Sequence, residues 1–99
     1  MAKIDFARLR ADLRPHFEQI VRGLLPGGRL EGHEYVALNP TRADHHPGSF
    51  RINVKTGFWA DFATGDTGGD VISLYAFLNG CRQIEAAREL MKLVGGDAR

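Results

Sequence analysis

Side chains suited to contacting a nucleic acid lie close together in the middle of the chain. Arg51, Lys55 and Trp59 follow one another at intervals of four residues, and Arg42 precedes them. On a sheet, an aromatic ring stacks on bases while guanidinium and ammonium groups meet phosphates, which is a common way to hold a single strand. These four residues are therefore candidate nucleic-acid contacts. The alternative for Trp59 is that it packs beneath the first helix or beneath the polar loop 41–48.

Three carboxylates, Asp61, Asp66 and Asp70, lie in a stretch that contains no basic residue. Such a set could hold a divalent cation, as in phosphoryl-transfer enzymes. The set matches no recognised metal motif, and Asp70 stands immediately before an apolar run, where aspartate caps the first turn of a helix. We therefore assign Asp70 as a helix N-cap and rank a metal-dependent phosphodiester enzyme last among the functional hypotheses.

Thiol and imidazole groups are sparse. The chain has one cysteine, Cys81, and four histidines, of which His45 and His46 are adjacent and tend to point apart. One cysteine excludes an internal disulfide and every zinc site that uses two or more thiolates. We expect no bound metal, no cofactor and no catalytic residue.

Composition limits the class of protein. The 99 residues are 43% hydrophobic and 25% charged, with a net charge of +1, which is typical of one globular domain over 1–99. No apolar run reaches the ~18 residues that a membrane span needs, and the N-terminus lacks the apolar segment of a signal peptide. We expect a cytoplasmic protein without a membrane partner. Basic residues in 1–30 could add phosphate contacts, although a solvated helix surface is the simpler explanation.

An amphipathic pattern predicts a helix in the N-terminal segment. Apolar residues recur every three to four positions between residues 9 and 24, and Asp5 is placed to cap the helix. Pro15 lies inside the pattern. Because proline is costly beyond the first turn of a helix, we expect either a break near Arg14 or a kinked single helix.

Three strands are expected, over 35–38, 49–54 and 58–62. A three-residue hairpin loop, Lys55-Thr56-Gly57, joins the last two, with Gly57 in the left-handed conformation. This loop predicts the cross-strand pairs Val54–Phe58, Ile52–Ala60 and Phe50–Phe62 on the buried face. Trp59 and Asp61 would then lie with Arg51 on the opposite face.

Two helices are expected after the strands. The run 71–78 is apolar nearly all round, which predicts a central buried helix, and 83–94 has one apolar stripe. The expected fold is an α+β domain, in which a three-stranded antiparallel sheet packs with an N-terminal helix and two C-terminal helices.

Several short motifs occur in a fixed order. Pro47-Gly48-Ser49-Phe50 opens a strand, Trp59-Ala60-Asp61-Phe62 follows the hairpin, and Gly68-Gly69-Asp70 enters a helix. In this order and spacing, residues 32–90 resemble the N-terminal zinc-binding domain of bacterial and phage DNA primases, in particular the variants at the front of primase–helicase proteins of phages and plasmids. The resemblance implies a zinc-ribbon-like core over 29–94, preceded by a helical segment over 1–28.

The resemblance fails at the zinc ligands. The four ligand positions of the family correspond to Asn39, Arg42, Asp61 and Thr64, none of which is a cysteine or a histidine. We hypothesise that a polar and ionic cluster replaces the metal. In this hypothesis Arg42 pairs with Asp61, and Asn39 and Thr64 complete the hydrogen bonds. Arg51 is the alternative partner for Asp61 across the strands.

The resemblance also implies a function. In that family the domain contacts single-stranded template through basic and aromatic residues of its sheet, which implies Arg51, Lys55 and Trp59 here and leaves Phe58 in the core. No catalytic acidic motif of a primase polymerase core occurs in the chain, so we expect a non-catalytic module. Its partners would be single-stranded DNA and a replicative helicase, primase or polymerase of a phage or plasmid. The alternative is a small protein-interaction or inhibitor protein of a mobile element with the same fold.

Overall fold

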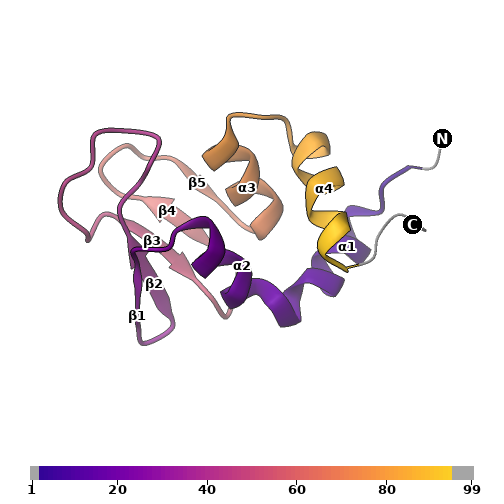
Figure 1. The fold of residues 1–99 in the computed structure, drawn as a ribbon, viewed down its shortest axis with the longest axis horizontal. Helices are drawn as coiled ribbons and strands as arrows, with labels where there is room; N and C mark the ends of the chain where they lie inside the picture. Colours follow the sequence, from indigo (N-terminus) through magenta and orange to yellow (C-terminus); the bar gives the residue numbers. More distant parts are fainter. Residues whose placement is uncertain (1–2, 95–99) are drawn as a thin grey trace.

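Helices pack against one face of an antiparallel sheet in the computed structural model, which describes residues 3–94 (Figure 1). The sheet forms one end of the molecule, and α1 and α4 lie at the other. This arrangement confirms the α+β class. Within the described residues, no helix has the length and apolar character needed to cross a membrane. In chain order the elements are α1 (Phe6–Leu13), η1 (Arg14–His16), α2 (Phe17–Leu24), β1 (Arg29–Glu31), β2 (Glu34–Ala37), β3 (Phe50–Asn53), β4 (Trp59–Asp61), β5 (Thr67–Gly68), α3 (Val71–Asn79), α4 (Gln83–Met91) and η2 (Lys92–Val94).

Two helices, not one, make up the N-terminal segment. Asp5 caps α1 as expected, because its carboxylate accepts the amide of Arg8 at 3.1 Å. The chain then tightens into the 3-10 turn η1, which contains Pro15, and continues as α2 from Phe17. Proline has no amide hydrogen and its ring clashes with the carbonyl four residues earlier, so α-helical hydrogen bonds do not continue through it. The break expected near Arg14 is therefore confirmed.

The sheet has five antiparallel strands in the order β1-β2-β3-β4-β5, so the expected number of three is wrong. The three expected strands correspond to β2, β3 and β4, and one short strand is added at each edge. β1 has three residues, all exposed, and β5 has two. Strands of two or three residues are too short for an alternation of apolar and polar residues to be recognised, which is why the sequence pattern did not reveal them.

The register between β3 and β4 is shifted by one residue from the expected one. Ile52 lies opposite Trp59, and Phe50 lies opposite Asp61. Directly opposed residues share a face, so Trp59 and Asp61 point toward the helices together with Phe50 and Ile52, and all four are buried. The expectation that Trp59 and Asp61 lie on the face away from the core is wrong.

The turn between the two strands causes this shift. Four residues, rather than three, separate Asn53 from Phe58, whose carbonyl accepts the Asn53 amide at 2.7 Å. The side chain of Asn53 accepts the amides of Lys55 and Thr56 at 2.9 and 3.0 Å and thereby stabilises the longer turn. Gly57 adopts the expected left-handed conformation, with a φ of +86°.

A cluster of three aromatic side chains packs the sheet against the helices. The Trp59 ring packs edge-on against Phe50, and its centroid lies 4.9 Å from that of Phe77 in α3. Trp59 Nε1 donates to Ser73 Oγ at 2.9 Å, which satisfies the polar atom of the indole inside the core. Gly68 lies opposite Trp59, and a Cβ there would come within 2.5 Å of the indole nitrogen. Only glycine therefore leaves room for this ring.

The helix α3 is well defined at both ends. The Asp70 carboxylate accepts the amide of Ser73 at 2.8 Å, and the Ser73 hydroxyl completes a capping box. Gly80, in the left-handed conformation, ends the helix. The next helix, α4, changes into the 3-10 turn η2 after Met91, whereas the sequence predicted one helix over 83–94.

Candidate functional site

The four residues expected to contact nucleic acid do not lie on one surface. Arg51 is on the outer face of the sheet, which we define as the face away from the helices. Lys55 lies in the β3–β4 turn, beside the N-terminal helices. Trp59 is 2% exposed and belongs to the core, so its ring is not available to a base. Arg42 belongs to an ionic cluster at the end of β4.

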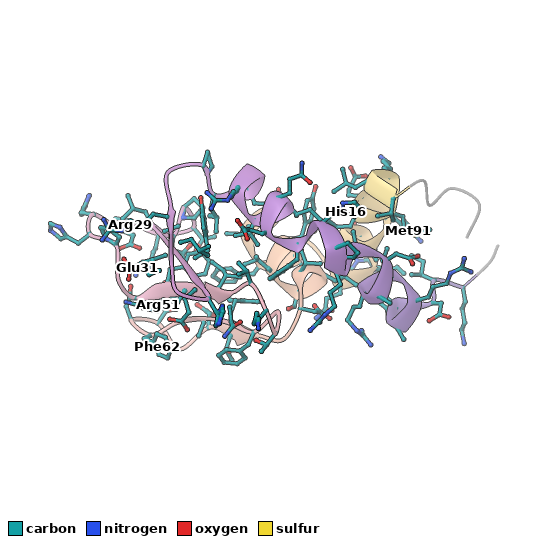
Figure 2. All side chains as sticks on the ribbon, turned by 90° about the horizontal axis from the view of Figure 1, so that it is seen from below. His16, Arg29, Glu31, Arg51, Phe62 and Met91 are labelled. Carbon is teal, nitrogen blue, oxygen red and sulfur yellow. The ribbon has the colours of Figure 1, made fainter. Side chains whose placement is uncertain are left out.

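Two phenylalanines take the place of Trp59 on the outer face. Phe58 and Phe62 are 51% and 70% exposed, although both were expected on the buried face of the sheet. The shifted register explains both changes, because it exchanges the two faces of β4. Figure 2 shows Phe62 and Arg51 at the sheet end of the molecule. The signal that could have found these rings is Asn53, whose side chain favours a longer turn.

Positive and negative charges are balanced on the outer face. Arg51 Nη1 lies 3.1 Å from a carboxylate oxygen of Glu34 and 3.9 Å from one of Glu31. Arg51 Nε donates to the carbonyl of Gly48 at 2.8 Å, and Arg29 pairs with Glu31 at 3.0 Å. These pairs are partly exposed, so each contributes little to stability. The outer face is therefore an aromatic surface with mixed charges, not a basic patch.

Asp61 is the centre of the ionic cluster, which we define as Asn39, Arg42, Asp44, Ser49 and Asp61. The side chain of Asp61 is fully buried. Arg42 donates to it at two points, through Nε at 2.8 Å and through Nη2 at 3.3 Å. Asn39 Nδ2 donates at 2.8 Å, and a neighbouring backbone amide donates at 2.9 Å. The carboxylate thus accepts four hydrogen bonds, two of them from the charged guanidinium of Arg42.

Loop residues surround this central pair. Arg42 Nη2 also donates to Ser49 Oγ at 2.8 Å and lies 3.4 Å from a carboxylate oxygen of Asp44. Asp44 in turn accepts the backbone amide of Asn39 at 2.8 Å. Sequence reasoning missed Asp44 and Ser49, because a polar loop carries no periodicity that marks which side chains turn inward. Together these contacts tie the loop after β2 to the end of β4.

The hydrogen bonds determine the charge state of the pair. The bond from Arg42 holds the pKa of Asp61 far below its usual range; burial opposes this effect, and the bonds from Asn39 and the Ala63 amide add to it. The same bond raises the pKa of Arg42. Both groups therefore stay charged at neutral pH, and the pair remains an ion pair.

The structure differs from the expected cluster in two details. Thr64 lies beside the cluster without joining it through its side chain, since Oγ1 donates to Asp66 at 2.8 Å. Only the backbone amide of Thr64 reaches Asp61, at the carbonyl oxygen, 3.2 Å away. Arg51 is not a partner of Asp61, because the shifted register places the two side chains on opposite faces of the sheet.

The cluster does not fit a zinc ion. Zinc takes thiolate, imidazole or carboxylate ligands, whereas Arg42 is always protonated and its guanidinium occupies the space beside the carboxylate of Asp61. The other two carboxylates of the acidic stretch, Asp66 and Asp70, are not part of the cluster, since Asp66 bonds Thr64 and Asp70 caps α3. Within the described part of the chain, no three His, Cys, Asp or Glu side chains gather into a possible metal site.

Comparisons with known proteins identify the fold. No protein-family model matches the chain, and no curated protein matches it. Among solved structures, the chain is similar to the crystal structure of the primase of Aquifex aeolicus, comprising zinc-binding and RNA polymerase domains, with a TM-score of 0.78 and 24% sequence identity. The match covers 95% of this chain and 22% of the primase chain. The chain has the fold of the zinc-binding domain of a bacterial primase.

Proposed function

We propose that this chain is a non-catalytic nucleic-acid-binding module of the primase zinc-domain type, which holds single-stranded DNA template on the outer face of its sheet. The observation that carries the proposal is the exposure of Phe58 and Phe62, which directly precede and follow β4, the strand paired with that of Arg51. The fold supports a role in DNA replication. The resemblance to primase–helicase variants favours a phage or plasmid protein that works in the cytoplasm beside a helicase, primase or polymerase.

The two exposed rings are spaced to suit a single strand. Phe58 and Phe62 are four residues apart along an extended backbone, a separation of about 13 Å at ~3.3 Å per residue. A single strand can place one base on each ring, and each stacked base contributes about 1–3 kcal/mol to binding. A duplex has no free base faces to offer. The rings therefore favour single-stranded over double-stranded nucleic acid.

Electrostatic attraction contributes less than stacking on this face. Arg51 is held by Glu34 and Glu31, so part of its charge is already neutralised before a phosphate arrives. A protein that neutralises few phosphates loses little affinity as the salt concentration rises. We therefore expect a shallow salt dependence of single-strand binding.

The ionic cluster has a structural role in this proposal. The resemblance places Arg42 and Asp61 at two of the positions where the family has zinc ligands. In this chain the pair, with Asn39, joins the loop after β2 to the end of β4 beside Phe62, as a metal ion would. Arg42 is engaged in these bonds and is therefore not one of the proposed nucleic-acid contacts.

Fluorescence anisotropy of a labelled oligothymidylate tests the proposal. The wild-type chain should bind, and the double variant Phe58→Ala/Phe62→Ala should bind at least tenfold more weakly, because two stacking contacts are lost. Leu93→Ala is the matched control, since it removes an exposed apolar side chain from η2, which is not part of the sheet. No binding by the wild type, or equal binding by the double variant, would refute the proposal.

A second candidate function is binding to a replication protein. The observation that favours it is an apolar groove of about 390 Å³ between α2, α3 and α4, lined among others by Ile20, Leu24, Tyr75 and Leu90. Such a groove suits an apolar side chain of a protein partner. A wild-type chain that ignores the oligonucleotide but co-elutes with a helicase or primase from the same genome would favour this function over the first.

A further inference from the structure

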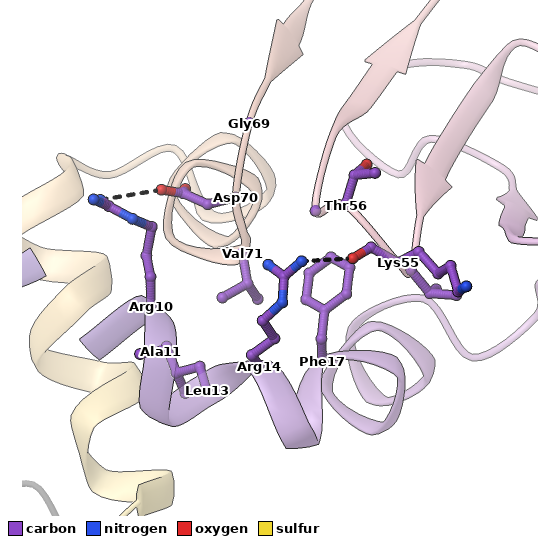
Figure 3. Close-up of a pocket in the computed structure, with 12 residues that line it drawn as sticks. Arg10, Ala11, Leu13, Arg14, Phe17, Lys55, Thr56, Gly69, Asp70 and Val71 are labelled. Carbon is purple, nitrogen blue, oxygen red and sulfur yellow. Dashed lines mark hydrogen bonds and ion pairs between the residues drawn. The ribbon is translucent and has the colours of Figure 1, made fainter. Parts of the chain in front are cut away.

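A pocket of about 460 Å³ lies between the N-terminal helices, the β3–β4 turn and the start of α3 (Figure 3). It is on the helix side of the sheet, whereas the proposed nucleic-acid surface is on the outer face. The proposed function makes no use of this pocket. Its volume falls within the range of small-molecule sites in proteins.

Cations dominate the polar lining of this pocket. Arg10, Arg14 and Lys55 contribute three positive charges and Asp70 one negative charge, which leaves a net charge of +2 (three minus one). Figure 3 shows Arg10 and Arg14 extending from the same side of the pocket toward α3 and the turn. The carboxylate of Asp70 is already engaged by the Ser73 amide at 2.8 Å and by Arg10 at 3.6 Å.

Most donors of these cations remain available. Arg14 Nη2 donates to the carbonyl of Lys55 at 2.8 Å, which uses one of the five N–H groups of a guanidinium. Within the described residues, no carboxylate lies within ion-pair distance of Arg14 or of the Lys55 ammonium. The side chains of Arg14 and Lys55 thus line the pocket without an acidic partner among the described residues, and an anion would supply one.

The inner lining of the pocket is apolar. Phe17 and Val71 are buried core residues that show one side to the pocket, and Val54 adds a half-buried side chain from the turn. A free inorganic anion would gain nothing from these groups. A nucleoside phosphate gains binding free energy from two kinds of contact, because its phosphate pairs with the cations and its sugar or base covers apolar surface.

We propose that this pocket binds a nucleoside phosphate. The phosphates bind Arg10, Arg14 and Lys55, and the sugar or base lies against Phe17 and Val71. The source is either a free nucleotide or the phosphorylated 5′ end of a strand, which share the same chemistry. This proposal does not depend on the outer face, because the residues of the two surfaces are different.

Calorimetric titration of the full chain with ATP at low salt tests this proposal. We expect saturable binding of one ATP per chain and at least a tenfold loss of affinity in Arg10→Gln/Arg14→Gln. Arg8→Gln is the control, since Arg8 lies on the same helix as Arg10, is exposed and does not line the pocket. Circular dichroism of each variant checks that it is folded, and Arg14→Lys, which keeps the charge, should retain most of the binding.

Competing ligands sharpen the result. Inorganic tripolyphosphate should bind more weakly than ATP, and equal affinity would overturn the assignment of the apolar lining. Displacement of ATP by a 5′-phosphorylated oligonucleotide, and not by its 5′-hydroxyl form, would support a strand end as the source; displacement by neither would support a free nucleotide.

The proposal is overturned if ATP does not bind, or if Arg8→Gln weakens ATP binding as much as Arg10→Gln/Arg14→Gln does. Phe58→Ala/Phe62→Ala should leave ATP binding unchanged, which separates this proposal from the outer-face function.

Discussion

Two of the contacts between arginine and aspartate in this molecule differ in burial and in geometry. In the ionic cluster, Arg42 contacts Asp61 at two points, 2.8 and 3.3 Å away, and the carboxylate is fully buried. At the pocket, Arg10 approaches Asp70 at one point, 3.6 Å away, and the two side chains are 47% and 24% exposed. One pair is enclosed and short, and the other is open and long.

The difference indicates which charges are available to a ligand. If this pair broke, the buried carboxylate of Asp61 would lose its cation without gaining solvent, so Arg42 stays paired with Asp61 in the folded chain. An exposed pair contributes little and exchanges with water, so Arg10 can turn to another anion at small cost. The Arg42–Asp61 pair therefore has a structural role, whereas the Arg10–Asp70 pair belongs to a surface that can bind an anionic ligand.

The largest expected effect is that of Arg42→Ala. This change leaves the buried carboxylate of Asp61 without its cation, which lowers the free energy of unfolding by about 3 kcal/mol. Arg10→Ala removes only an exposed contact and should change that free energy by less than about 0.5 kcal/mol. Urea denaturation followed by circular dichroism measures both. If both variants lost the same free energy of unfolding, the distinction between a structural pair and an exposed pair would be wrong.

A smaller effect is expected from acid. The pKa of Asp61 in the folded chain lies below its ordinary value of 3.8, so the unfolded chain takes up a proton first as the pH falls. The stabilising contribution is complete above about pH 4 and decreases below it, by on the order of 2 kcal/mol at pH 2. Denaturation curves between pH 6 and pH 2 should show a shallower decline for Asp61→Asn, which has no such proton to bind. Parallel curves would argue against an ionised Asp61.

The smallest effect concerns the wall of the pocket. Gly57 has a φ of +86°, and a Cβ there would lie 3.1 Å from the carbonyl of Gly69, so Gly57→Ala should cost about 1–2 kcal/mol. Gly32→Ala is the control, because Gly32 has a φ of +63° with open space around it. A larger drop in melting temperature for Gly57→Ala would show that close backbone packing holds this wall in place. An equal drop would reduce the effect to backbone strain alone.

Features that depend on neighbouring residues were predictable from the sequence. Asp5 and Asp70 cap helices through amides three residues ahead, and Pro15 breaks the first helix. Each of these effects acts within one turn of a helix, so spacing alone reveals it. The same holds for Gly57, whose left-handed conformation follows from its place at the end of a tight turn.

Features that depend on distant segments were not predictable in the same way. One extra residue in the turn, stabilised by Asn53, exchanged the faces of β4 and moved Trp59 inside and Phe62 outside. Alternation shows that a strand has two faces, but not which of them meets the core when both carry aromatic residues. The pocket escaped prediction for a related reason, because Arg14 and Lys55 are 41 residues apart along the chain.

The position of Trp59 has a practical consequence. It is the sole tryptophan of the chain, and its indole connects β4 to Ser73 in α3 through a hydrogen bond inside the core. Its emission therefore reports whether that helix is seated on the sheet. A change in the Trp59 emission spectrum when a ligand is added would indicate movement of α3 and not stacking on a base. Tryptophan fluorescence is therefore an intrinsic probe of the packing of α3 on the sheet.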